Sequence, residues 1–187
     1  MKRFYHLLWH LWLTLDFVCV AFWWQVVCKD PVKRRQHFIK NSCRIAKRYL
    51  KAFQLTTKVF NPERLKVLDQ KPHLVVANHV SYIDIMILSS LHPFVFITSV
   101  EMGDNLFLGD ITRLGGSLYT NRKTVVSLPG EVAKFAAAIK QGFNVILFPE
   151  GTSTDGSDIR PFRSSLFETA IQAQADILPI CIKYTRI

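Results

Sequence analysis

From residue 74 to residue 84 the chain reads Leu-Val-Val-Ala-Asn-His-Val-Ser-Tyr-Ile-Asp. The first four residues form a short apolar run typical of a buried strand, and a second apolar run covers residues 83–88. A strand that turns into a helix would bring His79, in the turn, close to Asp84, in the first helical turns. On one straight helix these two side chains would point to different faces. The stretch therefore predicts a strand–turn–helix unit that holds a histidine beside a carboxylate.

His79 and Asp84 are residue types that together can take a proton from an alcohol. A histidine titrates near neutral pH, so it can act as a base towards a hydroxyl group. A carboxylate beside it can fix its tautomer and stabilise the imidazolium that forms. Taken alone, however, His79 is better explained as a surface or core histidine at the end of a strand.

A second block of a similar kind follows further along the chain. Residues 148–152 read Phe-Pro-Glu-Gly-Thr, directly after the apolar run 145–147. The proline and the glycine favour a rigid turn with close backbone approach, and Glu150 adds a carboxylate. An ordinary strand-to-loop turn would explain the proline and the glycine but not the whole pentad.

The two blocks together resemble the glycerophospholipid acyltransferase superfamily, of the 1-acylglycerol-3-phosphate acyltransferase type. That family carries an Asn-His-x-x-x-x-Asp block and a Phe-Pro-Glu-Gly-Thr block, and both stand here letter for letter. Residues 116–122 resemble the family's glycine-to-arginine block, and residues 177–182 resemble its final proline-containing strand. The resemblance covers roughly residues 70–187, and four blocks in series are far more specific than one.

The resemblance implies an O-acyltransferase that moves a fatty acyl group from acyl-CoA or acyl-carrier protein to the free hydroxyl of a lysolipid. His79 would be the general base and Asp84 its orienting partner. The chain has no Gly-x-Ser-x-Gly elbow and no cysteine near either block, so direct attack by the acceptor is favoured over an acyl-enzyme. No cofactor and no metal are expected, and the acyl donor is a co-substrate. The residues expected to bind substrate are Asn78, Arg122, Glu150, Gly151 and Thr152.

Position 153 departs from the pattern of family members that form phosphatidic acid. Those members often carry an arginine after Glu-Gly-Thr, whereas this chain has Ser153 followed by Thr-Asp-Gly. That continuation resembles the branch that includes lyso-ornithine lipid acyltransferases. The predicted acceptor is 1-acylglycerol-3-phosphate, and lyso-ornithine lipid or another lysolipid is the alternative. Ser153, Arg160 and Arg163 are candidates for head-group contacts, although exposed loop charge explains the two arginines equally well.

Apolar runs alternate with helical patterns from residue 70 onward, which indicates an α/β layer fold. We expect a mixed, mostly parallel sheet flanked by helices. The predicted strands are residues 73–77, 94–99, 117–120, 144–148 and 177–184. The predicted helices are residues 83–91, 125–141 and 164–174.

Residues 1–28 are predicted to be a hydrophobic membrane anchor. Phe4 to Cys28 is an almost unbroken apolar run that holds all four tryptophans, and at 1.5 Å per residue it could cross a bilayer core of about 30 Å. A buried core helix is the alternative. His6, His10 and Asp16 weaken a simple span and would be easier to place in an interfacial helix.

Residues 29–69 are predicted to form a basic amphipathic helix on the membrane surface, followed by a linker. Residues 1–51 carry eleven Lys and Arg against two acids, whereas residues 52–187 carry thirteen against twelve. Beside an apolar run, this charge favours membrane lipids over nucleic acid as the partner. If the chain spans, the basic residues after the run would put the catalytic domain on the cytoplasmic face.

Residues 70–187 are predicted to be the acyltransferase domain. The chain stops soon after its last predicted strand, as a short family member or a fragment would. The four cysteines show no paired spacing, so neither a disulfide framework nor a metal site is expected. A membrane lipid-binding protein that keeps this fold without turnover is the non-enzymatic alternative.

Overall fold

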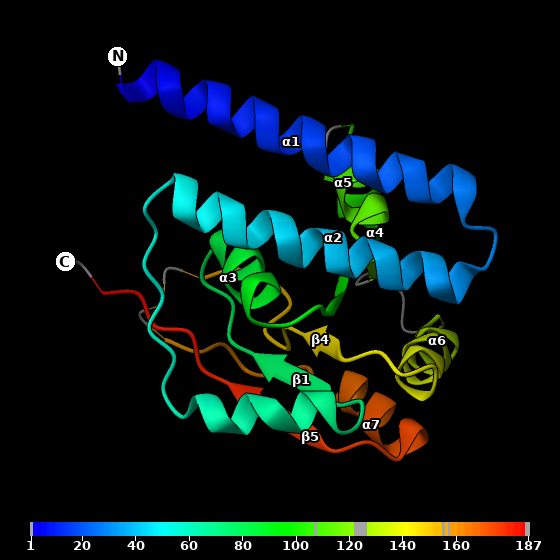
Figure 1. Cartoon of the computed structure of the whole chain (residues 1–187). Coiled ribbons are helices and arrows are strands. Elements are labelled where there is room, and N and C mark those ends of the chain that lie inside the picture. The colour runs from blue at the N-terminus through cyan, green and yellow to red at the C-terminus, as the bar shows by residue number, and fades with distance from the viewer. Residues whose placement is uncertain (1, 107, 122–126, 155, 157, 186–187) are drawn as a thin grey trace.

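The computed structural model describes residues 2–106, 108–121, 127–154, 156 and 158–185, with the backbone alone for residues 2 and 3. Two long helices come first, and an α/β unit follows them (Figure 1). The elements, in chain order, are α1 (Lys2–Val27), α2 (Pro31–Ala52), the 3₁₀ helix η1 (Pro62–Asp69), β1 (Leu74–Ala77), α3 (Ile83–Leu91), β2 (Val95–Ser99), α4 (Val100–Gly103), α5 (Leu108–Leu114), β3 (Leu118–Thr120), α6 (Leu128–Lys140), β4 (Val145–Leu147), the 3₁₀ helix η2 (Ser164–Phe167), α7 (Glu168–Ala173) and β5 (Ile177–Ile180).

The five strands form one sheet in the order β3-β2-β4-β1-β5, and every pairing is parallel. β1 lies between β4 and β5, with Val76 opposite both Leu147 and Pro179. Loops that leave the carboxyl ends of β1, β4 and β5 therefore emerge side by side. This register decides which parts of the chain meet at the site.

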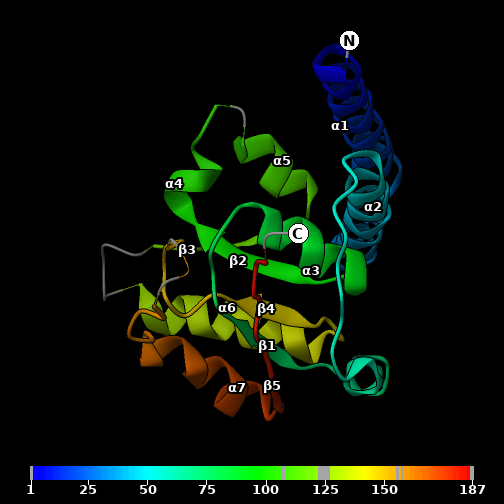
Figure 2. The ribbon, with the colours of Figure 1, turned by 90° about the vertical axis from the view of Figure 1, so that its left-hand side faces the viewer.

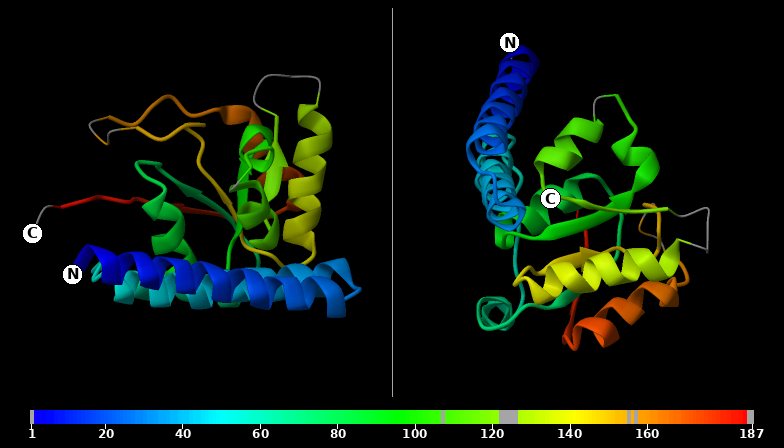
Figure 3. Two further views of the ribbon diagram at one scale, coloured as in Figure 1. Left: turned by 90° about the horizontal axis from the view of Figure 1, so that it is seen from above. Right: turned by 90° about the vertical axis from the view of Figure 1, so that its right-hand side faces the viewer.

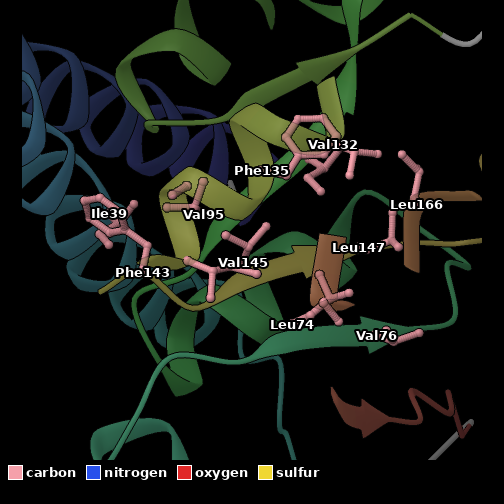
Figure 4. Close-up of a cluster of buried hydrophobic side chains, with 14 residues drawn as sticks. Ile39, Leu74, Val76, Val95, Val132, Phe135, Phe143, Val145, Leu147 and Leu166 are labelled. Carbon is pink, nitrogen blue, oxygen red and sulfur yellow. The ribbon is translucent and has the colours of Figure 1, made fainter. Parts of the chain in front are cut away.

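Both faces of the sheet are buried, which explains why its central strands are continuously apolar. Leu74 and Val76 face α6 and α7, in a cluster that includes the fully buried Phe135 (Figure 4). Val75 and Ala77 face the opposite side, where Leu88 of α3 covers them. Truncating a buried phenylalanine such as Phe135 to alanine would cost about 3–5 kcal/mol.

α1 and α2 form an antiparallel pair along one flank of the α/β unit (Figures 1 and 3). Asp30 caps α2, because its Oδ1 accepts hydrogen bonds from the N–H groups of Val32 and Lys33 at 2.8 and 3.1 Å. The Asp16 side chain of α1 faces its partner helix. Asp16 accepts two hydrogen bonds from Arg44, at 2.9 and 3.0 Å, and also pairs with Arg48.

The outer side of α1 carries exposed apolar side chains, among them Leu8, Leu11, Leu15 and Trp23. Within the described residues, Phe4–Val27 is the one helix that is long and apolar enough to cross a membrane. α2 packs on the α/β unit through its other side, where Ile39 belongs to the core cluster. A charged residue such as Asp16 is unfavourable in a lone apolar span, and its ion pairs with α2 explain its presence in this helix.

The predicted fold class is confirmed, with three differences in detail. The sheet was expected to be mixed, but all of its pairings are parallel. The last strand ends at Ile180, not at residue 184, and the predicted helix 164–174 begins as the 3₁₀ helix η2. The sequence patterns also missed η1, α4 and α5, which are short. α4 and α5 stand above the sheet beside the α1–α2 pair (Figure 2).

Candidate active site

Asp84 is the centre of the site, and both of its oxygens accept hydrogen bonds. Its Oδ2 lies 2.9 Å from His79 Nδ1 and accepts the N–H groups of Val80 and Ser81 at 2.7 and 2.9 Å. Its Oδ1 accepts the hydroxyl of Tyr184 at 2.5 Å. The side chain is fully buried. Burial works to raise the pKa of Asp84, but the hydrogen bonds from His79, Ser81, Tyr184 and Val80 outweigh it and hold the pKa below its ordinary value.

This carboxylate also decides the tautomer of His79. Because Nδ1 faces an ionised oxygen, it carries the proton, and Nε2 keeps its lone pair. The strand–turn–helix geometry thus brings together two side chains that a straight helix would separate. An imidazole whose Nδ1 faces a buried carboxylate is the arrangement of a general base.

Residues 148–154 hold His79 from the other side. The His79 ring stacks on Phe148, with 4.3 Å between centroids and 21° between the planes. The His79 N–H donates to Glu150 Oε1 at 2.8 Å, and its carbonyl oxygen accepts from Thr154 N at 3.0 Å. The two sequence blocks meet because β1 and β4 are neighbours in the sheet.

A large cavity of about 1440 Å³ opens beside His79. Most of its lining is apolar and comes from the sheet, from α3 and α5, and from the α1–α2 pair. Representative lining residues are Leu13, Phe17, Ile45, Met86, Phe96 and Ile111. The polar residues of the lining include His79, Thr152, Ser153 and Arg163. A proton acceptor therefore stands at the wall of a space suited to an apolar substrate.

Comparison with known families agrees with this geometry. The Acyltransferase family model matches residues 56–183. The chain belongs to the Acyltransferase family. The resemblance predicted from the sequence blocks is thereby confirmed.

Two curated relatives of this chain carry different acceptors in their names. A 1-acyl-sn-glycerol-3-phosphate acyltransferase from Neisseria gonorrhoeae is 32% identical over 111 residues, which cover 59% of this chain and 44% of the relative. A lyso-ornithine lipid O-acyltransferase from Pseudomonas aeruginosa is 34% identical over 118 residues, which cover 63% of this chain and 45% of the relative. The chain thus spans a little under half the length of these relatives.

A solved structure supports the fold of this chain. The crystal structure of PlsC, the 1-acyl-sn-glycerophosphate acyltransferase from Thermotoga maritima, matches with a TM-score of 0.65 and 20% identity. The match covers 93% of this chain and 74% of the other. Since it covers nearly the whole chain, it includes helices at the N-terminal end as well as the sheet.

Several predicted substrate-binding residues have structural partners within the described part of the chain. Asn78 joins two loops, because its amide donates to Ile182 O at 2.9 Å and accepts from Ile182 N at 2.7 Å. Glu150 is almost fully buried, and its Oε2 accepts the N–H of Arg160 at 3.0 Å while its Oε1 accepts that of His79. Through these contacts, Asn78 and Glu150 hold the active-site turn in place. A direct contact of either side chain with an acceptor lipid stays a prediction.

Some of the candidates for head-group contact line the cavity in the structure, and others do not. Thr152, Ser153 and Arg163 are exposed and line the cavity, so they lie where it opens to solvent. Gly151 has a φ of +73°, and a Cβ there would stand 3.0 Å from Arg163 Nε, so this glycine leaves room for the guanidinium. Arg160 is exposed and does not belong to the cavity lining. Arg122 lies outside the described residues.

Sequence reasoning missed Tyr184. The residue follows the proline-containing strand block, but nothing in its own surroundings indicates a partner 100 positions earlier in the chain. The pairing of β5 with β1 and the hydrogen bonds between Asn78 and Ile182 bring it to Asp84. Within the described residues, no three His, Cys, Asp or Glu side chains gather as they would around a metal ion.

Proposed function

We propose that this chain transfers a fatty acyl group from a thioester, acyl-CoA or acyl-carrier protein, to the free hydroxyl of a lysolipid. The observation that carries this proposal is the hydrogen-bonded His79–Asp84 pair at the wall of a large apolar cavity. Ordinary small-molecule pockets hold about 300–1,000 Å³. A cavity larger than that suits a long acyl chain together with a polar head group.

The proposed reaction needs a single base and no covalent intermediate on the protein. His79 Nε2 takes the proton of the acceptor hydroxyl as its oxygen attacks the thioester carbonyl carbon. Asp84 stabilises the imidazolium that forms. The tetrahedral intermediate then collapses, the carbon–sulfur bond breaks, and the leaving thiolate receives the proton from the imidazolium.

For the acceptor, we propose that Arg163 supplies the positive charge that Ser153 does not. Arg163 lies at the mouth of the cavity beside Gly151 and Ser153, where an acceptor head group would stand when its hydroxyl approaches His79. A phosphate brought there needs a charge-assisted partner to offset its desolvation. The proposed acceptor is 1-acylglycerol-3-phosphate, and lyso-ornithine lipid, named in several relatives, is the alternative.

We also propose that the protein is attached to a membrane by the outer face of α1. That face is apolar and exposed, and tryptophan, phenylalanine and leucine side chains make up most of it. The ion pairs of Asp16 favour a helix that remains packed on α2 over a lone span. Membrane lipids are then the partners, and the basic charge of α2 favours the cytoplasmic face.

The function is tested with the full chain reconstituted in phospholipid vesicles. A radiolabelled acyl-CoA and an acyl-carrier-protein donor are each incubated with a panel of lysolipids, and the lipid products are separated. Appearance of a diacyl product that depends on one lysolipid supports the proposal and names the acceptor. Vesicle-bound, folded protein that consumes neither donor with any lysolipid would instead indicate a lipid-binding protein without turnover.

Variants at position 153 separate the two acceptors within the same assay. If the acceptor is 1-acylglycerol-3-phosphate, Ser153→Arg adds a second cation near its phosphate and is tolerated or improves KM. If the acceptor lacks a terminal phosphate monoester, the added charge remains without a partner and KM rises. An unchanged KM for both acceptors would remove position 153 from the head-group site.

A further inference from the structure

Tyr184 donates a hydrogen bond to the one oxygen of Asp84 that the His79 turn does not hold. Three N–H donors gather on Oδ2, from the His79 ring and from the backbone of Val80 and Ser81. The Tyr184 hydroxyl is the hydrogen-bond donor to Oδ1 within the described residues. Burial, and then the hydrogen bond to the carboxylate, raise the pKa of Tyr184 far above its ordinary value, so the hydroxyl keeps its proton.

The fold places this hydroxyl through two fixed contacts. β5 pairs in parallel with β1, with Ile180 opposite Ala77. Beyond the strands, Asn78 binds both the N–H and the carbonyl oxygen of Ile182. The chain is therefore held two residues before Tyr184, against the loop that carries His79. The side chain at position 184 therefore lies beside Asp84, at the start of α3.

We propose that Tyr184 is a positioning residue of the acyl transfer, which keeps the Asp84 carboxylate in the orientation that holds the His79 ring. This inference rests on the proposed function. Tyr184 is not part of the cavity lining, so it acts through Asp84 and not on a substrate. Without the hydroxyl, Oδ1 is a buried acceptor with no donor, and the carboxylate can turn to share its donors between both oxygens. The imidazole then loses its fixed orientation.

The variant Tyr184→Phe removes this hydroxyl together with its hydrogen bonds to Asp84 and to the Ser81 side chain. Tyr184 is 43% exposed, so the folded protein does not depend on burying it. A hydrogen bond to a charged group is worth enough for a drop in kcat of about tenfold. KM for both substrates should stay unchanged, because neither substrate touches the tyrosine. Tyr119→Phe is the matched control, since it also removes a tyrosine hydroxyl bond, here to Thr112 Oγ1 at 2.8 Å.

A second readout does not depend on turnover. The Nδ1 proton of His79 is followed by ¹H NMR and assigned by its loss in His79→Gln. In Tyr184→Phe it should move upfield and exchange faster with water, while Tyr119→Phe leaves it in place. If the wild-type chain acylates no lipid, the proposed function fails, but this resonance still tests the contact between the tyrosine and the pair.

A double-mutant cycle with Asp84→Asn distinguishes positioning from a structural role. If Tyr184 acts through Asp84, adding Tyr184→Phe to Asp84→Asn should lower kcat no further. Two losses that multiply would overturn the proposal. So would an unchanged kcat, or an unchanged His79 resonance, in the single variant Tyr184→Phe.

Discussion

At the scale of single residues, most of the site's polar side chains position His79. Of His79, Asp84, Glu150 and Tyr184, only His79 lines the cavity, and the other three fix its position directly or through Asp84. Glu150 fixes the backbone of His79, and Asp84 fixes its ring. A general base must lie within hydrogen-bond reach of the substrate oxygen. The contacts that fix the backbone and the ring of His79 therefore decide how well the imidazole can accept the proton.

Arg163 gives a prediction about the acceptor at this scale. Arg163→Ala should raise KM for an anionic acceptor about tenfold and leave kcat nearly unchanged, because one charge-assisted contact to the head group is lost. The measurement is initial rate against lysolipid concentration in mixed micelles. Arg160→Ala is the comparison, since its side chain does not line the cavity. A larger rise in KM for the Arg160 variant than for the Arg163 variant would show that Arg163 is not the arginine that binds the head group.

At the scale of elements, the site depends on which strands are neighbours. The apolar runs and the turn residues predicted β1, β4 and α3 nearly to the residue, and the two sequence blocks predicted which side chains carry the chemistry. The contact between Glu150 and the His79 backbone, and the approach of Tyr184, could not be predicted. Both depend on β1 lying between β4 and β5, and an order of strands is not encoded in any one segment.

Short elements escaped prediction for a related reason. α4 and α5 have four and seven residues, too few for a helical period to show in the sequence. α4 begins where the Ser99 hydroxyl accepts the N–H of Met102 at 3.3 Å, and tertiary packing supports the rest. These helices matter for function, because Met102 and Ile111 line the cavity.

Glu131 gives a prediction about pH and stability. This buried carboxylate of α6 accepts hydrogen bonds from Thr120 Oγ1, Asn121 N and Ser127 Oγ at 2.6, 2.9 and 2.9 Å. Burial works to raise the pKa of Glu131, but these bonds outweigh it, so its pKa lies below the ordinary 4.5. A lowered pKa stabilises the fold above the unfolded value and ceases to do so as the pH falls through the folded value.

The variant Glu131→Gln should therefore lower the free energy of unfolding at pH 7 by roughly 1–2 kcal/mol. The difference from wild type should shrink as the pH falls below 4.5 towards the lowered pKa of the folded carboxyl, because the unfolded wild-type chain then binds the proton more readily than the folded one. Urea unfolding followed by circular dichroism at several pH values measures this. A difference that is the same at pH 7 and at pH 4 would show that the charge of Glu131 does not stabilise the fold.

At the scale of the whole molecule, the α1–α2 pair joins the cavity to the proposed membrane surface. Residues on the inner side of both helices line the cavity, while the outer face of α1 is exposed and apolar. The sequence predicted both helices from hydropathy and charge, but their pairing through Asp16 and Arg44 required the structure.

Membrane attachment is tested at the outer face of α1. Leu11→Ser, Leu15→Ser and Trp23→Ser in one chain should release the protein from anionic vesicles, since each removes exposed apolar surface worth about 1.5–3 kcal/mol when buried in lipid. Co-sedimentation with vesicles is the measurement. Deleting residues 1–51 would be less clean, because α2 contributes Ile39 to the core. A folded triple variant that still pellets completely would place the membrane surface elsewhere.

The central claim is that His79 removes the proton of a lysolipid hydroxyl. The most direct measurement compares kcat for diacyl-lipid formation by the wild-type chain and by His79→Ala, with vesicle binding and melting temperature recorded for both. The account predicts a loss of roughly 10²–10⁴-fold in kcat with binding and folding retained. A His79→Ala variant that acylates the same lysolipid at a near wild-type rate would contradict it.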